Sequence, residues 1–534
     1  MLSMTDSVYN PTPVIELFGS EEESFYQLGI KDRESVEISL HHIKSLISTK
    51  WNTINKQIHG IAAELVDKVS YHSNHHERLL QAYSDGLQVK KADIKFALMI
   101  PEICSFIGSN TPDLSRLGFG CSSFFSLNKH GEPVHHRVLD FPLKGTYDQF
   151  ERVQLSHFKN KNKVINFSSV GLPFSGLTSM NESGLTLGIH QKFTDHFNVH
   201  GESIFYLAHE LIHQCHNIED VKNFLMKHQT ITNWNFNCLD RDGNVLSADL
   251  CGNKVTFLEH DLEDGPIYFC NELLDQDLKQ ADFIPSGINN YNDKRIDSAY
   301  SKLKKLALYD MDDPGMLKYL STPTKKKKFH IDPITLSSVS SVLFNPLQES
   351  CYHVYGESPK IHVGKTEKYS KVFDTYQRTL IETKALKNNV TTKEALAHLS
   401  LAQSHFDLNQ ISECYHELQM SIEKNRGTPY EAISKFYFLV VQYIYEEHLN
   451  VLSHLQDDIL EFYDDLPTYL QEVAIIIDQR LSILCSTKQV LTANISNENL
   501  KKRYRFESKK GKLAHQIFKK STFIHIDIFD VIFL

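Results

Sequence analysis

The sequence predicts an α+β protein that ends in an all-α region, as the distribution of strand and helix patterns indicates. Between residue 121 and about residue 368, short apolar stretches typical of strands, such as 164–170 (VINFSSV) and 185–193 (LTLGIHQKF), alternate with helical patterns. One helical pattern, 202–228, is expected to form a single long amphipathic helix. Before residue 121 the periodicity is mostly helical, and after about residue 369 the strand pattern vanishes. We therefore expect four regions: a helical segment 1–120, an α+β domain 121–368, a helical domain 369–490 and a tail 491–534.

Composition and charge exclude several classes of protein. The chain has 534 residues, of which 41% are hydrophobic, so that sizeable cores can form. A net charge of −10 argues against nucleic acid as a partner. The longest apolar run, 436–445, is interrupted by Gln442 and is too short for a membrane span. The first residues do not have the pattern of a signal peptide, so that we expect a cytoplasmic location. The nine scattered cysteines include no CxxC pair, so that we expect free thiols.

The strongest chemical signal surrounds Cys121, which follows Gly120 directly and precedes Arg137 and Asp140. If the chain is cut between Gly120 and Cys121, the new N-terminal cysteine carries a thiol nucleophile beside its own α-amine, which can act as the base. Arg137 can favour the thiolate, and the carboxylate of Asp140 can hold the amine by a charge-assisted hydrogen bond. The sequence therefore predicts a cysteine enzyme that processes itself at this junction.

The junction itself has features that suit self-cleavage. The residues before it, 107–120, contain the proline and glycine typical of an exposed loop. Gly120 has no side chain and permits the strained backbone that such a cleavage needs. We expect the cut to need no external protease.

The spacing of Cys121, Arg137 and Asp140 resembles that of the choloylglycine hydrolases, and the surrounding sequence is similar to the isopenicillin-N acyltransferase branch of the same superfamily of N-terminal nucleophile (Ntn) hydrolases. The similarity rests on the order of several segments, each of which is weak alone. These segments are 25–40, 79–103, 171–191, 233–250, 266–274 and 334–356. The resemblance implies an αββα four-layer sandwich for residues 121–368.

The resemblance also implies roles for residues outside the Cys121 segment. Asn271, on the strand that bears the family's asparagine, is expected to donate a hydrogen bond in the oxyanion hole. The chain departs from the family where Gly-Ile-His190 and Gln191 stand in place of an asparagine, and His190 and Gln191 remain candidates for contacts to the oxyanion or the substrate. Arg295 is the nearest candidate for the arginine that binds substrate in the family.

The C-terminal part has two patterns. Residues 394–425 have helical spacing with a break at 407–410, which resembles one degenerate repeat of the tetratricopeptide (TPR) kind. A protein partner that binds this region is possible. In the tail, a basic stretch precedes an alternation of Ile524, Ile526 and Ile528 with polar residues. The alternation favours an edge strand or a peptide docked on the protein, and contact with an anionic membrane is the alternative.

The motif HELIH at 209–213 is the main rival signal. On a helix, His209 and His213 share one face, and Glu210 can act as the base of a zinc protease. We expect no metal site, because no third histidine follows at the usual spacing and no glutamate ligand is evident on a later helix.

The sequence therefore predicts a cysteine amidase or N-acyltransferase that acts on linear amide C–N bonds, needs no cofactor, and takes a small amide or acyl thioester. Hydrolysis and acyl transfer differ only in the final acceptor, and both stay open. The alternative from another class is an interaction protein with a helical repeat and a retired enzyme domain.

Overall fold

The computed structural model describes most of the chain. The ranges described are 10–48, 52–69, 73–110, 120–141, 144–192, 194–275, 286–306, 308–324, 332–384, 387–496, 498–520, 522–524 and 531–533. The predicted cleavage loop lies largely outside them, since residues 111–119 are not described, while Gly120 and Cys121 are. In the tail, Ile526 and Ile528 also lie outside the described residues.

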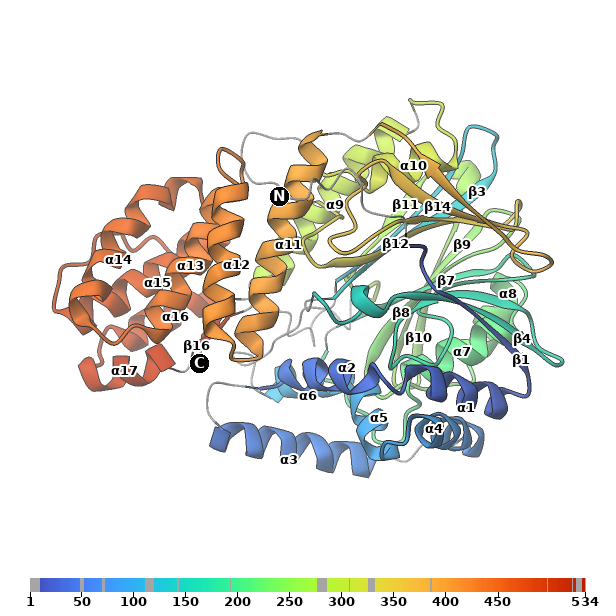
Figure 1. The fold of residues 1–534 in the computed structure, drawn as a ribbon, viewed down its shortest axis with the longest axis horizontal. Coiled ribbons are helices and arrows are strands. Elements are labelled where there is room, and N and C mark those ends of the chain that lie inside the picture. Colours follow the sequence, from blue (N-terminus) through green and yellow to red (C-terminus); the bar gives the residue numbers. More distant parts are fainter. Residues whose placement is uncertain are drawn as a thin grey trace.

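Two β-sheets lie in the right half of the molecule as drawn in Figure 1. The first has eight strands in the order β1-β4-β5-β6-β7-β8-β9-β10. Their bounds are β1 Val14–Gly19, β4 Arg152–Phe158, β5 Val164–Ser168, β6 Thr178–Asn181, β7 Thr186–Gln191, β8 Asn233–Leu239, β9 Asn244–Cys251 and β10 Lys254–Asp261. The strands predicted at 164–170 and 185–193 are thereby confirmed as β5 and β7.

The second sheet has seven strands in the order β11-β2-β3-β12-β13-β14-β15. Their bounds are β2 Cys121–Leu127, β3 Pro133–Asp140, β11 Ile267–Phe269, β12 Ser338–Asn345, β13 Ser350–Val354, β14 Lys365–Ser370 and β15 Gln377–Glu382. Apolar side chains of the two sheets meet in a shared core, where Leu155 and Phe167 of the first sheet pack with Val342 and Phe344 of the second. Because strand residues alternate between faces, the other face of each sheet is left for helices.

Helices cover both outer faces, so the predicted four-layer sandwich is confirmed. The helices α9 (Ser286–Leu306) and α10 (Asp313–Leu320) pack on the seven-stranded sheet, and α7 (Ile204–Gln214) and α8 (Ile218–Leu225) pack on the eight-stranded one. The prediction of one helix over 202–228 is wrong, since α7 ends at Gln214. Asn217 begins a new helix by accepting a hydrogen bond from the backbone N–H of Asp220 at 2.9 Å.

The N-terminal region is helical, as predicted, except for one strand. Its helices are α1 (Glu21–Asp32), α2 (Val36–Ser45), α3 (Asn52–Lys68), α4 (Asn74–Leu87), α5 (Lys91–Leu98) and α6 (Ile100–Asn110). Before them, β1 pairs in parallel with β4 and so extends the eight-stranded sheet. Only Leu17 of this edge strand is buried, so its apolar pattern in the sequence is weak. The N-terminal region is thus built into the sandwich.

A helical array follows the sandwich (Figure 1). Its helices are α11 (Lys387–Asp407), α12 (Ile411–Lys424), α13 (Glu431–Tyr445), α14 (Leu449–Phe462), α15 (Thr468–Cys485), α16 (Glu498–Glu507) and α17 (Lys512–Lys520). The predicted break at 407–410 separates α11 from α12. The strand β15 continues the sheet to Glu382, beyond the boundary expected at 368, because β15 is an exposed edge strand with little apolar signal. The tail contributes a short antiparallel pair, β16 (Thr522–Ile524) and β17 (Val531–Phe533).

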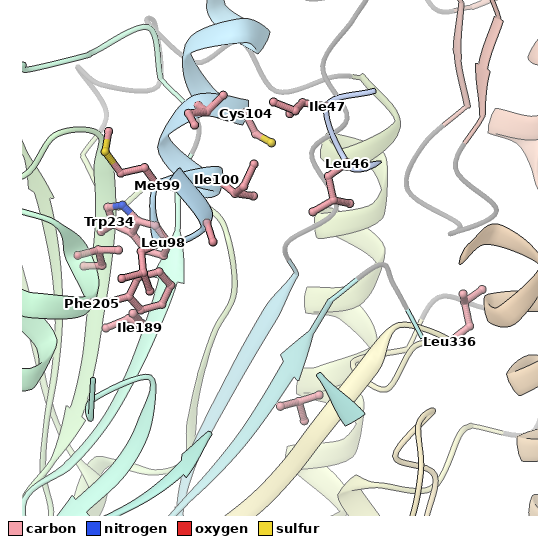
Figure 2. Packing of buried hydrophobic residues seen from close by; sticks show 14 of the residues in the cluster. Leu46, Ile47, Leu98, Met99, Ile100, Cys104, Ile189, Phe205, Trp234 and Leu336 are labelled. Atoms are coloured by element: carbon pink, nitrogen blue, oxygen red, sulfur yellow. The ribbon is translucent and has the colours of Figure 1, made fainter. Parts of the chain in front are cut away.

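Buried hydrophobic residues join these regions. One cluster of buried side chains contains members of the N-terminal helices, of α7 and of the helical array. Figure 2 shows part of it, with Leu98, Met99 and Ile100 of the N-terminal region beside Ile189, Phe205 and Trp234 of the sandwich. Within the described residues, no helix has the length and apolar character needed to cross a membrane.

Glu102 on α6 is buried within this junction and gives a testable dependence of stability on pH. Burial raises the pKa of Glu102 to about 8, although the Ile204 backbone and the Trp234 indole lower it in part. The pKa of this carboxyl is higher in the folded protein than in the unfolded chain. The carboxyl therefore stabilises the fold at pH values below its pKa in the unfolded chain, and this contribution is lost as the pH rises toward 8. We therefore expect Glu102→Gln to be stabilising relative to the wild type at pH 9, on the order of a few kcal/mol, and close to neutral at pH 5.

Thermal unfolding at both pH values measures this effect. Glu64→Gln, which changes an exposed carboxyl on α3, should leave the difference between the two pH values unchanged. An equal effect of Glu102→Gln at pH 5 and pH 9 would show that this carboxyl is not held neutral by burial.

Candidate active site

Cys121 is the first residue of β2, and the pairing of β2 with β3 brings it to Arg137. In this antiparallel pair, Cys121 lies opposite Leu139 and Ser123 lies opposite Arg137. The guanidinium Nη2 of Arg137 lies 3.0 Å from the Sγ of Cys121. The spacing of sixteen residues therefore follows from a short hairpin, in which the arginine reaches the cysteine from the neighbouring strand.

The fold fixes the position of Arg137 closely. Its side chain is fully buried, and Nη2 also donates to the backbone oxygen of Ile189 on β7, 2.7 Å away. The neighbouring Gly188 leaves the space that this requires: a Cβ at position 188 would lie 2.7 Å from the Cδ of Arg137. Gly188 is therefore a residue of the site that the motif alone did not identify.

Burial controls the protonation of Cys121 in the uncut chain. It raises the pKa of the thiol above its ordinary value, while the nearby guanidinium of Arg137 lowers it by a smaller amount. The sequence suggested that Arg137 favours the thiolate. The arginine does act in that direction, but in the uncut chain desolvation outweighs it, because a buried thiolate loses its hydration.

The carbonyl of Gly120 is held by the backbone of Asp140. The Asp140 N–H donates to the Gly120 oxygen at 3.0 Å. On its carboxylate, Oδ1 accepts from the hydroxyl of Ser338 at 2.6 Å, while Oδ2 has no hydrogen-bond partner among the described residues. A Cβ on Gly120 would lie 2.5 Å from this Oδ2. Glycine is thus required here for a reason that the sequence did not show, the close approach of the Asp140 carboxylate to the backbone.

Asn271 and Arg295 complete the surroundings of the junction. The amide oxygen of Asn271 accepts from the backbone N–H of Cys121 at 2.9 Å and from Nη2 of Arg295 at 2.7 Å. Its Nδ2 donates to the backbone oxygen of Gln191 at 2.9 Å. Nη1 of Arg295 lies 3.6 Å from Oδ2 of Asp140. The structure therefore places Asn271 at the nitrogen of the Gly120–Cys121 peptide bond and Arg295 beside both Asn271 and Asp140.

His190 lies behind the site and does not face the cavity beside Cys121. Its Nδ1 is 3.1 Å from the backbone oxygen of Cys270, and its Nε2 is 3.0 Å from the hydroxyl of Ser123. Burial lowers the pKa of His190 well below its usual value, so that the ring is neutral. Lys192 donates to the same Cys270 oxygen at 2.7 Å. His190 and Lys192 therefore hold the backbone that precedes Asn271, and Lys192 was not predicted from the sequence.

Gln191 connects the site to the N-terminal region. Its Nε2 donates to the backbone oxygen of Pro101 at 2.8 Å and to the hydroxyl of Ser105 at 3.0 Å, both on α6. Its Oε1 is buried without a hydrogen-bond partner among the described residues. Gln191 also lines the cavity next to Cys121, so a contact to substrate stays a prediction.

A small apolar cavity of about 90 Å³ opens beside Cys121. Its lining comes from three parts of the chain: Ile43 and Ile100 of the N-terminal region, Phe205 and Trp234 of the sandwich, and Tyr147 of the loop after β3. Nearly all of the lining surface is apolar. A cavity of this kind excludes water and accepts a hydrocarbon group in preference to a charged one.

The loop after β3 is held by the N-terminal region and by the helical array. Thr146, which lines the cavity, bonds to the ring of His42 on α2, with 2.9 Å between Oγ1 and Nδ1. The backbone oxygen of Lys144 accepts from the hydroxyl of Ser404 on α11 at 2.8 Å. The helical array thus contacts the loop that forms one wall of the cavity.

The HELIH motif lies on α7, where its side chains make ordinary contacts with the N-terminal region. His209 lies 2.8 Å from Glu21 of α1, measured from Nε2 to Oε1. The ammonium group of Lys161 binds both Glu21, at 2.9 Å, and Glu210, at 2.8 Å. Oxygens of Glu21 and Glu210 and a nitrogen of His75 lie within 4.8 Å of one another. Lys161 supplies the positive charge between the two carboxylates.

One protein-family model matches part of the sandwich. Residues 146–316 match the model of the family described as acyl-coenzyme A:6-aminopenicillanic acid acyl-transferase. This part of the sandwich is similar to that acyltransferase family. The match confirms the predicted relation to the Ntn hydrolases and the prediction of an enzyme that hydrolyses amides or transfers acyl groups. The matched range includes Asn271 and Arg295 and begins after Asp140.

Solved structures that match the chain have low sequence identity and low TM-scores. The *Caenorhabditis elegans* ortholog of N-acylethanolamine-hydrolyzing acid amidase is 13% identical, with a TM-score of 0.32, over 42% of this chain and 93% of that one. Penicillin V acylase from *Agrobacterium tumefaciens* is 14% identical, with a TM-score of 0.32, over 50% and 99%. A conjugated bile acid hydrolase from *Clostridium perfringens* is 10% identical, with a TM-score of 0.32, over 48% and 96%. No curated protein matches the chain significantly.

Proposed function

We propose that the chain is a cysteine amidase or acyltransferase that activates itself by cutting the bond between Gly120 and Cys121. One observation carries the proposal: the Sγ of Cys121 lies 3.0 Å from Nη2 of Arg137 and borders an apolar cavity. A thiol in this position has a cation beside it and space for an acyl group in front of it.

Self-cleavage follows from the contacts around the peptide bond. The thiol of Cys121 attacks the carbonyl carbon of Gly120, and the N–H of Asp140 supports the negative charge that develops on the oxygen. The C–N bond breaks, the nitrogen takes up the thiol proton, and Gly120 becomes joined to Cys121 as a thioester. Water then hydrolyses the thioester, which releases the carboxylate of Gly120 and the free α-amine and thiol of Cys121.

The same groups serve a substrate once the chain is cut. The new α-amine starts at the position of the Cys121 nitrogen, which is bonded to Asn271, and Oδ2 of Asp140 is the acceptor that we assign to it. As the thiol attacks an amide carbonyl, the α-amine takes the thiol proton and passes it to the leaving amine. The second N–H of the Asn271 amide supports the oxyanion. Water or another amine then resolves the thioester, so that hydrolysis and acyl transfer share every earlier step.

The cavity limits the substrate to amides or thioesters with a small apolar acyl group. Part of its wall belongs to the N-terminal region, including Ile43 and Ile100. The fragment 1–120 must therefore stay bound after cleavage for the cavity to persist. Its strand β1 in the eight-stranded sheet and the buried ion pair between Asp32 and Arg152 support this.

Mass spectrometry of the intact purified protein tests the proposal. We expect two chains, 1–120 and 121–534, that elute together in gel filtration under native conditions. An uncut protein that cleaves amides at full rate would contradict self-activation, and a cut protein without activity on any apolar acyl amide would contradict the enzyme assignment.

Contact between the helical array and the cavity loop gives a prediction for the proposed activity. Ser404→Ala removes the hydroxyl that holds the Lys144 backbone and loosens the loop that carries Thr146 and Tyr147. We expect KM for an apolar acyl amide to rise about fivefold, the effect of one neutral hydrogen bond, with cleavage of the chain unchanged.

Ser453→Ala is the matched control for this prediction, because Ser453 also donates to a backbone oxygen, at 2.8 Å, on the exposed surface of α14. This variant should keep the KM of the wild type. Equal KM values for all three proteins would show that the helical array does not shape the cavity.

A further inference from the structure

The helix α17 buries two of its polar residues and exposes two large apolar ones. His515 is buried and contacts the backbone oxygen of Glu507 at 3.0 Å, and the buried Lys519 donates to the backbone oxygen of Glu446. Leu513 and Ile517, one turn apart, are 75% and 52% exposed. This is the reverse of the usual arrangement, in which the apolar stripe of a surface helix faces the core. The outward face of α17 thus presents aliphatic side chains to the solvent.

Phe506 extends this apolar surface onto α16. It is 53% exposed, and its ring centroid lies 6.3 Å from that of Phe518 on α17. The ammonium group of Lys510 lies 4.6 Å from the centroid of the Phe506 ring. Phe506, Leu513 and Ile517 are hereafter called the α16–α17 patch. Figure 1 places α16 and α17 in the helical array, with α17 at the lower end of the array.

The surroundings of the patch are positively charged. Five cationic residues of this segment are exposed: Lys502, Arg505, Lys509, Lys510 and Lys512. After Glu498, the segment 499–520 contains only one acidic residue, Glu507. Glu507 is buried and bonded to Arg480 at 2.6 Å and to Arg503 at 2.7 Å, so it does not offset these charges at the surface. The surface around the patch is therefore basic, although the chain as a whole carries a charge of −10.

We propose that the α16–α17 patch binds the surface of an anionic lipid bilayer. Exposed leucine, isoleucine and phenylalanine can enter the boundary between head groups and acyl chains, while the surrounding lysines and arginine bind the anionic head groups. The positive charges favour a negatively charged lipid surface. The exposed aliphatic side chains favour a partner with an apolar interior into which they can insert, as a bilayer has. This inference goes beyond the proposed activity and does not depend on it.

Sedimentation of the full-length protein with vesicles tests the proposal. We expect binding to phosphatidylcholine vesicles that contain phosphatidylserine, little binding to pure phosphatidylcholine, and weaker binding at high salt. The double variant Leu513→Ser/Ile517→Ser should bind at least about tenfold more weakly. The triple variant K509Q/K510Q/K512Q should lose about fivefold in affinity for each lysine removed.

Matched variants separate the patch from general surface effects. Leu308 and Ile61 are 80% and 51% exposed elsewhere on the molecule, and L308S/I61S should bind vesicles as the wild type does. The exposed lysines 159, 371 and 384, changed to glutamine, should cause a smaller loss than the triple variant at the patch.

Several results would overturn the proposal. Wild-type protein that does not sediment with anionic vesicles would do so, as would a patch variant that binds them equally well. Loss of binding on changing Ile526 and Ile528 to serine, with no loss in L513S/I517S, would assign the contact to the tail. A dimer of the wild type that disappears in L513S/I517S, without vesicle binding, would assign the patch to a second copy of the chain.

Discussion

Replacing Cys121 by alanine is expected to leave one uncut chain of 534 residues that has lost amide-cleaving activity by roughly 10³-fold or more. The alanine removes the only atom that we assign as nucleophile both in self-cleavage and in turnover. Because the new α-amine forms only by cleavage, the variant lacks the proposed base as well. Denaturing gels and intact mass report the cut, and release of the amine from an apolar acyl amide reports activity.

Cys351→Ala is the matched control. Cys351 is a buried cysteine of β13, in the core between the sheets, and its replacement leaves a similar loss of volume far from the junction. It should be cut and active, with a lower melting temperature. If Cys121→Ala is cut as fast as the wild type, another group performs the cleavage and the Ntn mechanism is excluded.

The rate of self-cleavage should also depend on pH. Burial raises the pKa of Cys121 in the uncut chain, so that the reactive thiolate is the minor form at neutral pH. The rate should rise about tenfold per pH unit as long as the pH remains below this pKa. A rate that stays constant between pH 6 and 9 would indicate that thiolate formation does not control the step.

The parts of the site that lie close together in the sequence could be predicted. Cys121 and Arg137 belong to one hairpin, so a fixed spacing of sixteen residues corresponds to a fixed pair of neighbours in the sheet. Asn271 and Arg295 lie 150 and more residues away in sequence, and only the similarity to a family suggested them. The structure brings both to the junction, through contacts of Asn271 with Cys121 and of Arg295 with Asn271.

Other features depend on contacts that no local pattern reveals. His190 was a candidate for the oxyanion hole, but its partners are a backbone oxygen on another strand and the hydroxyl of Ser123. The importance of Gly188 arises from the side chain of Arg137, which crosses from the opposite sheet. The sequence alone does not distinguish a glycine whose backbone is approached closely by another side chain from a glycine that is needed in a turn.

The domain boundary shows the same limit for the fold. The strand β15 (QRTLIE) is an exposed edge strand that buries little apolar surface, and hence it lacks the alternation of an inner strand. The sheet therefore runs to Glu382, past the residue at which the strand pattern fades. Beyond it, α11 contributes Leu396 and Leu399 to a cluster that also contains Leu336 and Ile361 of the sandwich. The helical array and the sandwich therefore share one cluster of buried side chains.

Gly120→Ala is expected to slow self-cleavage at least about a hundredfold, with normal turnover in those molecules that are cut. A Cβ at this position would lie 2.5 Å from Oδ2 and 3.2 Å from Cβ of Asp140, and Asp140 is buried and bonded through Oδ1 to Ser338. The carboxylate cannot move away freely, so the Gly120 carbonyl must leave the N–H of Asp140 and its alignment with the thiol. Intact mass over time measures the cut, and activity divided by the fraction of cut chain measures turnover.

Two glycine variants make this result specific. Gly60 lies on α3 of the same N-terminal region, and a Cβ there would meet no atom within 4 Å, so Gly60→Ala should be cut at the wild-type rate. Gly188→Ala displaces Arg137, which stays in the mature enzyme, and should reduce both cleavage and turnover per cut chain. Because Gly120 leaves with the N-terminal fragment as a carboxylate, only its replacement should separate the two rates. A Gly120→Ala protein whose cut fraction also turns over slowly would mean that the 1–120 fragment, through its last residue, remains part of the working site.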